Sequence, residues 1–219
     1  MGVSLREETK DSRNEDEELS ITYRILLMLC MMLFFWQIFI LVIATTQCTD
    51  CIRVTCIGDS ITDGGGCHES SYVDYLREML GGNYSVLNAG KSGMTQLKKG
   101  LCNGGGDCSY WNTDSWKNAL TSDPDIVTMM LGTNDAKTFN WEGVQQNLGD
   151  YYALDYIDMI NQVRKKYGQK LPIYVMIPPP LYEPYPYEMN NTVINSILPS
   201  LLRDIATVSN TTIIDLYTV

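Results

Sequence analysis

Residues 52–62 read IRVTCIGDSIT, and this stretch decides the fold. Its first half is rich in β-branched residues and ends at Gly58, which predicts a buried strand leading into a tight turn. Similar runs predict strands over residues 84–87, 126–131, 173–177 and 212–216, with helices over residues 70–80, 147–167 and 193–208. Strands that alternate with helices predict an α/β protein in three α/β/α layers, in which helices cover both faces of a parallel sheet.

The first three predicted strands are each followed by a residue suited to acyl transfer. Ser60 follows the first strand, Gly90 the second and Asn134 the third. Acyl transfer needs a nucleophile and hydrogen-bond donors that face the developing oxyanion. Because the carboxyl ends of parallel strands meet at one edge of a sheet, we expect these residues to lie together there. Ser60 alone would be interpreted as a helix N-cap, but the three residues together favour a nucleophile site.

Segments 58–62 (GDSIT) and 132–135 (GTND), together with Gly90, resemble the first three sequence blocks of the SGNH (GDSL-type) hydrolase superfamily. The resemblance implies a flavodoxin-like sheet with strand order 2-1-3-4-5. It also implies that Ser60 is the catalytic nucleophile. The oxyanion hole would be formed by the backbones of Ser60 and Gly90 and the side chain of Asn134.

The same resemblance implies ester hydrolysis, often the deacetylation of carbohydrates. Residues 177–180 (IPPP) and 213–217 (IIDLY) are most similar to the carbohydrate-esterase and sialate-acetylesterase members. The first hypothesis is therefore a serine-dependent esterase that removes O-acetyl or other short acyl groups from carbohydrate-like substrates through an acyl-enzyme.

The chain departs from the superfamily pattern after the fifth predicted strand. The last block, an Asp-x-x-His, has no counterpart, and the single histidine, His68, lies in a glycine-rich loop. A serine without a general base is a poor nucleophile at neutral pH. We therefore expect residues 52–219 to form an SGNH-hydrolase-like domain that is C-terminally incomplete. The alternative is a catalytically inactive, membrane-anchored binding protein that lacks the Asp–His pair.

Two further residues are candidates for substrate binding. Asp59 precedes the nucleophile, although a helix cap is the simpler interpretation of this residue. Tyr182 lies in the Tyr- and Pro-rich segment 181–187, which is either a lid whose rings stack on sugars or an irregular surface loop. Cys48 and Cys51 have a spacing found in zinc sites, but no second pair completes four ligands, so we expect no metal and no organic cofactor.

The N-terminal part of the chain predicts a membrane anchor. Residues 1–24 are polar and are expected to be a disordered cytoplasmic tail. Residues 25–44 are apolar except for Gln37, and their length suits a transmembrane signal-anchor helix, followed by a linker over residues 45–51. Basic residues are more frequent before this helix than after it. This bias favours a lumenal or extracellular C-terminal domain, which would be secreted if the anchor were cleaved.

Glycosylation motifs and cysteines agree with an outside location. Sequons begin at Asn83, Asn190 and Asn210, and six of the seven cysteines follow the predicted anchor. Cys102 and Cys108 flank a glycine-rich loop and are the expected disulfide. The net charge of −10 argues against nucleic acid as a partner, so a small-molecule or glycan ester is expected instead.

Overall fold

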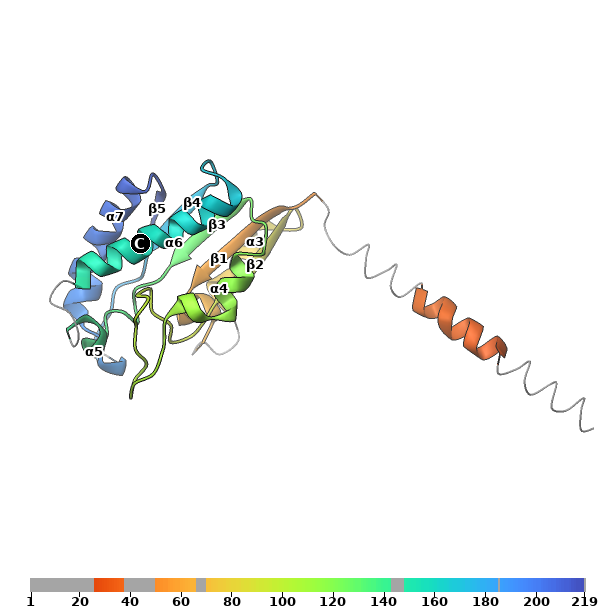
Figure 1. Cartoon of the computed structure of the whole chain (residues 1–219), viewed down its shortest axis with the longest axis horizontal. Helices are drawn as coiled ribbons and strands as arrows, with labels where there is room; N and C mark the ends of the chain where they lie inside the picture. Colours follow the sequence, from red (N-terminus) through yellow and green to blue (C-terminus); the bar gives the residue numbers. More distant parts are fainter. Residues whose placement is uncertain (1–25, 38–49, 66–69, 143–147, 185, 219) are drawn as a thin grey trace, which may run out of the picture. The chain divides into compact units, whose positions relative to one another are not determined.

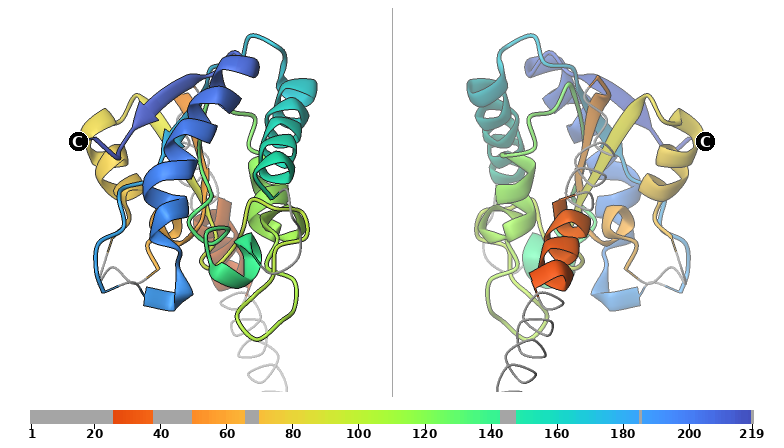
Figure 2. Two further views of the ribbon diagram at one scale, coloured as in Figure 1. Left: turned by 90° about the vertical axis from the view of Figure 1, so that its left-hand side faces the viewer. Right: turned by 90° about the vertical axis from the view of Figure 1, so that its right-hand side faces the viewer.

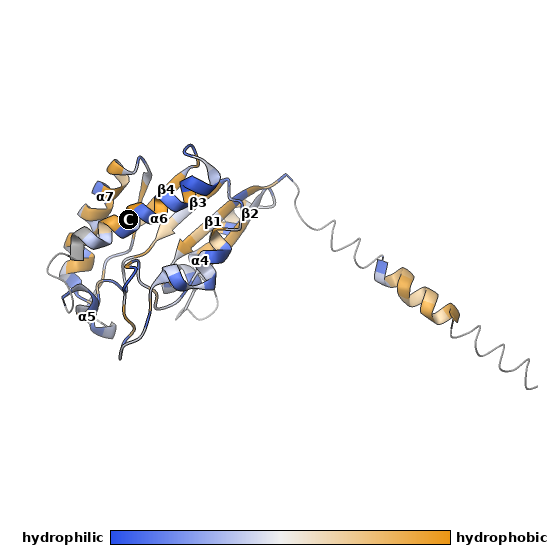
Figure 3. Cartoon of the chain, viewed as in Figure 1, coloured by the Kyte–Doolittle hydropathy of each residue, from blue (hydrophilic) through white to orange (hydrophobic). Residues whose placement is uncertain are grey.

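The computed structural model describes residues 26–37, 50–65, 70–142, 148–184 and 186–218, and the chain divides into two units, residues 1–49 and 50–219. In the first unit, residues 26–37 form a helix that is apolar along nearly its whole length (Figure 3). Within the described ranges, no helix is both long enough and apolar enough to cross a membrane. The predicted tail, the rest of the predicted anchor and most of the linker lie outside those ranges.

The second unit is built on one sheet of five parallel strands (Figure 1). Its strand order is β2-β1-β3-β4-β5, which confirms the order that the resemblance implied. The strands are β1 (Ile52–Gly58), β2 (Tyr84–Gly90), β3 (Ile126–Met130), β4 (Ile173–Ile177) and β5 (Thr212–Asp215). Because the strands are parallel, the segments that follow β1, β2 and β3 all leave from the same edge of the sheet.

Helices cover both faces of this sheet, as predicted. The α-helices are α2 (Ser60–Asp63), α3 (Tyr72–Leu80), α4 (Asp114–Ala119), α5 (Thr138–Trp141), α6 (Leu148–Tyr167) and α7 (Leu198–Val208). Two short 3-10 helices, η1 (Tyr110–Asn112) and η2 (Pro186–Glu188), and a π-helical segment, η3 (Val193–Ile197), lie between them. Helices α4, α6 and α7 share the larger apolar core with one face of the sheet. Helix α3 packs on the opposite face against a smaller cluster (Figure 2).

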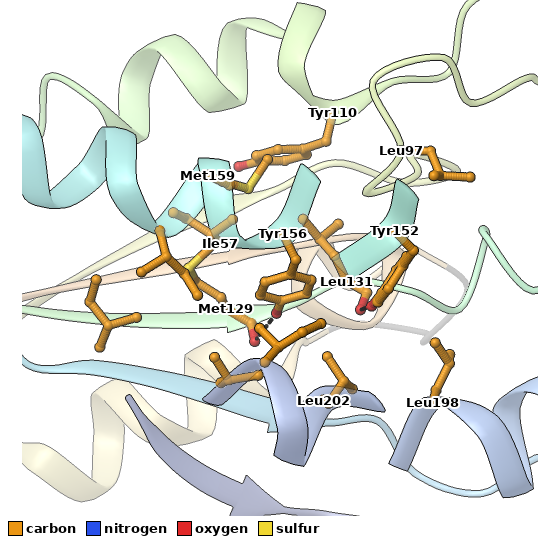
Figure 4. Close-up of a cluster of buried hydrophobic side chains, with 14 of the residues drawn as sticks. Ile57, Leu97, Tyr110, Met129, Leu131, Tyr152, Tyr156, Met159, Leu198 and Leu202 are labelled. Atoms are coloured by element: carbon orange, nitrogen blue, oxygen red, sulfur yellow. Dashed lines mark hydrogen bonds between the residues drawn. The ribbon is translucent and has the colours of Figure 1, made fainter. Parts of the chain in front are cut away.

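Two buried tyrosines of α6 fix the end of β3 in the larger core (Figure 4). The hydroxyls of Tyr152 and Tyr156 donate hydrogen bonds to the carbonyl oxygens of Leu131, at 2.8 Å, and Met129, at 3.0 Å. A buried phenol needs such a partner, because an unpaired polar group in the core costs free energy. The two bonds therefore satisfy the buried hydroxyls and also hold the end of β3, from which the loop to Asn134 begins.

The last predicted helix differs from the observed one. The sequence predicts a single helix over residues 193–208 with a kink at Pro199. The structure instead has η3 followed by α7, and Pro199 lies in the first turn of α7. Proline has no N–H to donate, so it is tolerated in the first turn of a helix, where that N–H would have no partner within the helix. The change in helix type therefore comes before the proline.

Candidate active site

Ser60 lies at the start of α2, directly after β1. Asp59 caps this helix, because its carboxylate accepts a hydrogen bond from the N–H of Ile61 at 3.0 Å. Gly58 makes the tight turn possible, since a Cβ at that position would lie 1.9 Å from the Oγ1 atom of Thr62. Ser60 is half-buried, and no described residue hydrogen-bonds to its hydroxyl. The turn therefore leaves the hydroxyl and the backbone N–H of Ser60 available to a ligand.

Gly90, predicted as the second oxyanion donor, has a different role. Its N–H donates a hydrogen bond to the side-chain oxygen of Asn88 at 2.9 Å. A Cβ at Gly90 would lie 2.2 Å from the backbone nitrogen of Asp63, so the missing side chain allows β2 to end against α2. The prediction that the N–H of Gly90 binds the oxyanion is therefore wrong, because this N–H already has a partner within the fold.

Gly93 offers a free N–H close to the same strand end. The N–H of Lys91 donates to the carbonyl of Gly58 at 2.9 Å, and the N–H of Met94 donates to the carbonyl of Lys91 at 3.4 Å. The first bond ties the turn to the end of β1, and the second closes a turn over residues 91–94 in which Gly93 is the third residue. Its φ of +80° is the value that a type II turn requires there, and glycine adopts it without strain.

The N–H of Gly93 has no partner among the described residues, and the space beside its Cα is open. Gly93 was not predicted from the sequence, because Gly90, which ends β2, was expected to be the donor instead. The Ser92-Gly93 pair, which is a common turn signal, was the available indication.

Asn134, the third predicted donor, follows β3 and is 3% exposed. Its Nδ2 donates a hydrogen bond to the carbonyl of Met94 at 3.0 Å, which ties Asn134 to the end of the turn that contains Gly93. An amide nitrogen carries two hydrogens, so one remains for a ligand. Gly58, the last residue of β1, pairs with Gly90 at the end of β2 and with Met130 at the end of β3. The structure therefore gathers Ser60, Gly93 and Asn134 at neighbouring strand ends.

Two buried carboxyl groups support these loops. Asp59 and Asp135 are fully buried. Burial raises the pKa of Asp59 to about 6, and the hydrogen bond from Ile61 only partly offsets that rise. Burial also raises the pKa of Asp135 to about 7, although its carboxylate accepts the N–H groups of Gln96 and Leu97, both at 2.8 Å. The predicted contact of Asp59 with substrate is wrong, because its side chain is inaccessible; the helix-cap interpretation is confirmed.

No general base for Ser60 is found in the part of the chain that the structure describes. His68 lies outside the described residues, and the Ser60 hydroxyl has no hydrogen-bonding partner within them. The described residues also contain no cluster of His, Cys, Asp and Glu side chains that could hold a metal ion.

The loop after β4 leaves from the same edge of the sheet and carries exposed aromatic rings. At one end, the side chain of Asn195 holds Leu181, accepting its N–H at 2.8 Å and donating to its carbonyl at 2.9 Å. At the other end, the N–H of Asn190 donates at 2.8 Å to a carbonyl in the loop after β3. Between these anchors Tyr182 is 77% exposed and Tyr187 is 73% exposed. Tyr187, which was not predicted as a site residue, has a left-handed φ of 59° that is uncommon for an aromatic residue.

The predicted disulfide between Cys102 and Cys108 is present, with Cα atoms 5.0 Å apart. It closes a glycine-rich segment that includes Gly106, whose carbonyl accepts the N–H of Cys102 at 3.1 Å. Cys51 is also disulfide-bonded, whereas Cys56 is a buried free thiol. The disulfide between Cys102 and Cys108 therefore constrains the loop that lies between β2 and α4.

The three sequon asparagines differ in accessibility. Asn83 and Asn210 are exposed. Asn190 is half-buried, and its side chain accepts the N–H of Thr192 at 3.0 Å and donates to Glu142 at 2.8 Å. Asn83 and Asn210 are therefore the sequon side chains that the fold leaves accessible.

The chain matches a protein-family model and a curated relative. The family model described as "GDSL-like Lipase/Acylhydrolase family" matches residues 56–219. An acetylxylan esterase of Xylanibacter ruminicola is 34% identical over 187 residues, which cover 77% of this chain and 36% of that protein. The chain thus spans about a third of the length of the curated relative that it matches.

Solved structures share the fold at lower identity. The acetyl xylan esterase AlAXEase has a TM-score of 0.57 at 21% identity, over 76% of this chain and 78% of that chain. The SGNH-hydrolase family esterase AlinE4 has a TM-score of 0.51 at 19% identity, over 77% of each chain. At these identities the likeness extends to the sheet and its helices, and the assignment of individual residues rests on the geometry described above.

Proposed function

Because this chain belongs to the GDSL-like lipase/acylhydrolase family, we propose that it is a serine-dependent ester hydrolase with Ser60 as its nucleophile. The Ser60 oxygen attacks the carbonyl carbon of an ester, the alcohol leaves as an acyl-enzyme forms, and water then releases the acid. The observation that carries the proposal is that Ser60, Gly93 and Asn134 lie at neighbouring strand ends, each with a donor that the fold leaves unused.

These donors would stabilise the negative charge that develops on the carbonyl oxygen. They are the backbone N–H groups of Ser60 and Gly93 and the second amide hydrogen of Asn134. Because the turn and the strand ends hold them in place, they need no reorganisation at the moment of attack. The loss of one such donor typically lowers the rate by about 10²–10³.

Ser60 must also lose its proton to a general base during the attack. The described residues provide no partner for the Ser60 hydroxyl, and this observation favours a second candidate. In that candidate, the protein keeps the Ser60 site without catalysis and acts as a membrane-anchored binding protein. The two candidates differ in one measurable property, which is the reactivity of Ser60.

We propose carbohydrate O-acetyl esters as the substrate class. Support comes from the relative named as an acetylxylan esterase and from the exposed rings of Tyr182 and Tyr187. Tyrosine rings present a flat apolar face and a polar tip, which suits the mixed surface of a sugar. Tyr182 would therefore bind the glycan, and the oxyanion donors would bind the ester carbonyl.

We also propose that residues 25–44 are a single-pass anchor and that the hydrolase domain is lumenal or extracellular. The support is the apolar composition of this segment, the bias of basic residues toward its N-terminal side, and the sequons and disulfides that follow it. Removal of N-glycans should increase the electrophoretic mobility of the protein. An unchanged mobility, with Asn83, Asn190 and Asn210 all unmodified, would argue against this topology.

The esterase proposal is tested by labelling the full chain with a fluorophosphonate probe, followed by peptide mass spectrometry. We expect the probe on Ser60, none on this site in Ser60→Ala, and labelling of Asn134→Ala that is about 10²–10³ slower. A folded wild-type chain whose Ser60 stays unlabelled would refute the esterase and favour the binding protein. Acetate release from acetylated xylan, compared between wild type and Tyr182→Ala, then tests the substrate class.

A further inference from the structure

Asp63 connects the nucleophile helix to the turn that contains Gly93. Its Oδ2 atom accepts two hydrogen bonds from Ser92, one from the backbone N–H at 3.0 Å and one from the hydroxyl at 2.6 Å. Hydrogen bonds to a carboxylate are stronger than those between neutral groups. Ser92 immediately precedes Gly93, so the carboxylate holds the residue next to the proposed oxyanion donor.

The helix end of this connection is rigid. Helix α2 is one turn long, with hydrogen bonds of 2.9 Å from Asp63 N–H to the Asp59 carbonyl and from Gly64 N–H to the Ser60 carbonyl. Ser60 and Asp63 are the two ends of this turn. The backbone that carries this carboxylate is therefore held in place relative to Ser60.

The glycine at position 65 makes room for Ser92 beside the nucleophile. A Cβ at Gly65 would lie 2.1 Å from the Ser92 hydroxyl oxygen and 3.7 Å from the Cβ of Ser60. The Asp63–Ser92 contact therefore lies next to the proposed reaction centre.

The rest of the turn is held by other bonds. Lys91 donates its N–H to the carbonyl of Gly58, and the carbonyl of Met94 accepts the amide of Asn134. Among the described residues, only Asp63 bonds to the central pair, Ser92 and Gly93, and both of its bonds go to Ser92. This pair decides where the Gly93 N–H points, because the central peptide rotates by roughly half a turn between type I and type II turns.

We propose that Asp63 is a positioning residue that acts through Ser92 to present the Gly93 N–H to the oxyanion. The catalytic part of this inference rests on the function proposed above, whereas the structural part does not. Loss of the carboxylate releases the tip of the turn, so the peptide samples orientations in which the Gly93 N–H faces away from the substrate. The Gly93 N–H is then still present, but it no longer points toward the oxyanion.

A matched control exists on α3. Asp74 accepts the N–H and the hydroxyl of Ser71 through its own Oδ2 atom, at 2.8 Å and 3.3 Å. Both aspartates are exposed and each bonds one serine in the same way. Asp74→Ala therefore removes a similar pair of serine bonds, together with the ion pair from Asp74 to Arg77 at 2.7 Å, without touching the turn over residues 91–94. It controls for a general loss of stability.

The experiment measures two quantities in wild type, Asp63→Ala, Ser92→Ala, the double variant and Asp74→Ala. The first is the exchange rate of the Ser92 amide hydrogen, measured by NMR on the full chain. The second is the fluorophosphonate reaction of Ser60, separated into the affinity constant and the maximal labelling rate.

In Asp63→Ala we expect the Ser92 amide to exchange about tenfold faster or more, as the loss of a bond to a charged acceptor predicts. We also expect the maximal labelling rate to fall about tenfold with the probe affinity unchanged, since only the transition state uses the oxyanion donors. Adding Ser92→Ala to Asp63→Ala should change neither quantity further. Asp74→Ala should leave both at the wild-type value.

Unchanged exchange of the Ser92 amide in Asp63→Ala would overturn the inference, whatever the labelling shows. Faster exchange with an unaltered labelling rate would also overturn it, because the bond would then be structural only. If wild-type Ser60 does not react at all, the proposed function fails, and the exchange rates still decide whether Asp63 holds the turn.

Discussion

Replacement of Gly90 by alanine tests the structural role that the fold assigns to this glycine. An added Cβ would lie 2.2 Å from the nitrogen and 2.6 Å from the Cα of Asp63, and 2.7 Å from the carbonyl carbon of Thr62. All three are backbone atoms, so no side-chain rotation can relieve the clash. Overpacking costs about 1–3 kcal/mol, and a rigid neighbour places Gly90→Ala near the upper value. For a domain of this size, about 3 kcal/mol lowers the melting temperature by about 6–12 °C.

Gly93→Ala is the comparison that separates the two glycines. Its Cβ meets no atom within 4 Å, so the cost comes only from the left-handed φ of +80°. That conformation costs an alanine about 1–2 kcal/mol, which corresponds to about 2–8 °C. We therefore expect Gly90→Ala to be the less stable variant, and Gly93→Ala to combine a smaller stability loss with slower labelling of Ser60.

The assay is thermal unfolding of both variants by circular dichroism under identical conditions, with chemical denaturation as a second measure. A Gly90→Ala protein that melts within 2 °C of wild type would refute the reasoning about the close approach of β2 to α2.

Two further predictions concern the buried acids and the disulfide. Burial raises the folded-state pKa of Asp59 to about 6 and of Asp135 to about 7, so between about pH 4 and pH 7 the folded chain binds protons that the unfolded chain has released. Stability should therefore fall as pH rises through this window. Asp59→Asn, which keeps a capping oxygen, should remove about 1.4 kcal/mol of the stability lost between pH 5 and pH 8, as measured by urea unfolding at those two pH values. An equal pH dependence in the variant would contradict this assignment. The disulfide between Cys102 and Cys108 spans a sequence separation of 6, so the double serine variant should lose at most about 2 kcal/mol, measured against wild type in the same denaturant. A much larger loss would mean that the disulfide holds more than its own loop.

The strands and helices follow largely from local patterns. The strand predicted over residues 173–177 is β4 (Ile173–Ile177), and the helix predicted over residues 147–167 is α6 (Leu148–Tyr167). The strand is an uninterrupted apolar run, and the helix has apolar residues at helical spacing. Each element can therefore be predicted as strand or helix from its own residues. The sheet order was implied by the resemblance of the motifs, and the structure confirms it.

The end of β2 shows where local reasoning fails. The sequence predicts that this strand stops at residue 87, because Asn88 and Gly90 are typical of turns. In the structure β2 continues to Gly90 and pairs with β1 over its whole length. Asn88 is accommodated because its Nδ2 donates to the carbonyl of Thr62 at 2.7 Å and its Oδ1 accepts the N–H of Gly90. One partner of the Asn88 side chain, Thr62, lies on another element, so the sequence pattern around β2 does not predict this contact.

The sequence by itself therefore determined the alternation of strands and helices, and it placed Ser60 and Asn134 directly after strands. Those properties depend on neighbouring residues and on the direction of parallel strands. Only the tertiary structure decided which glycine has a free N–H. That choice depends on one local contact and one distant contact. The side chain of Asn88 occupies the N–H of Gly90, two residues further on, and Asp63, 29 residues before Ser92, holds the turn that leaves Gly93 open. The bond to Asn88 removes one donor, and the contact of Ser92 with Asp63 holds the turn that carries the other. That second contact forms only when the segment after β2 folds beside α2, so the order of residues carries no record of it.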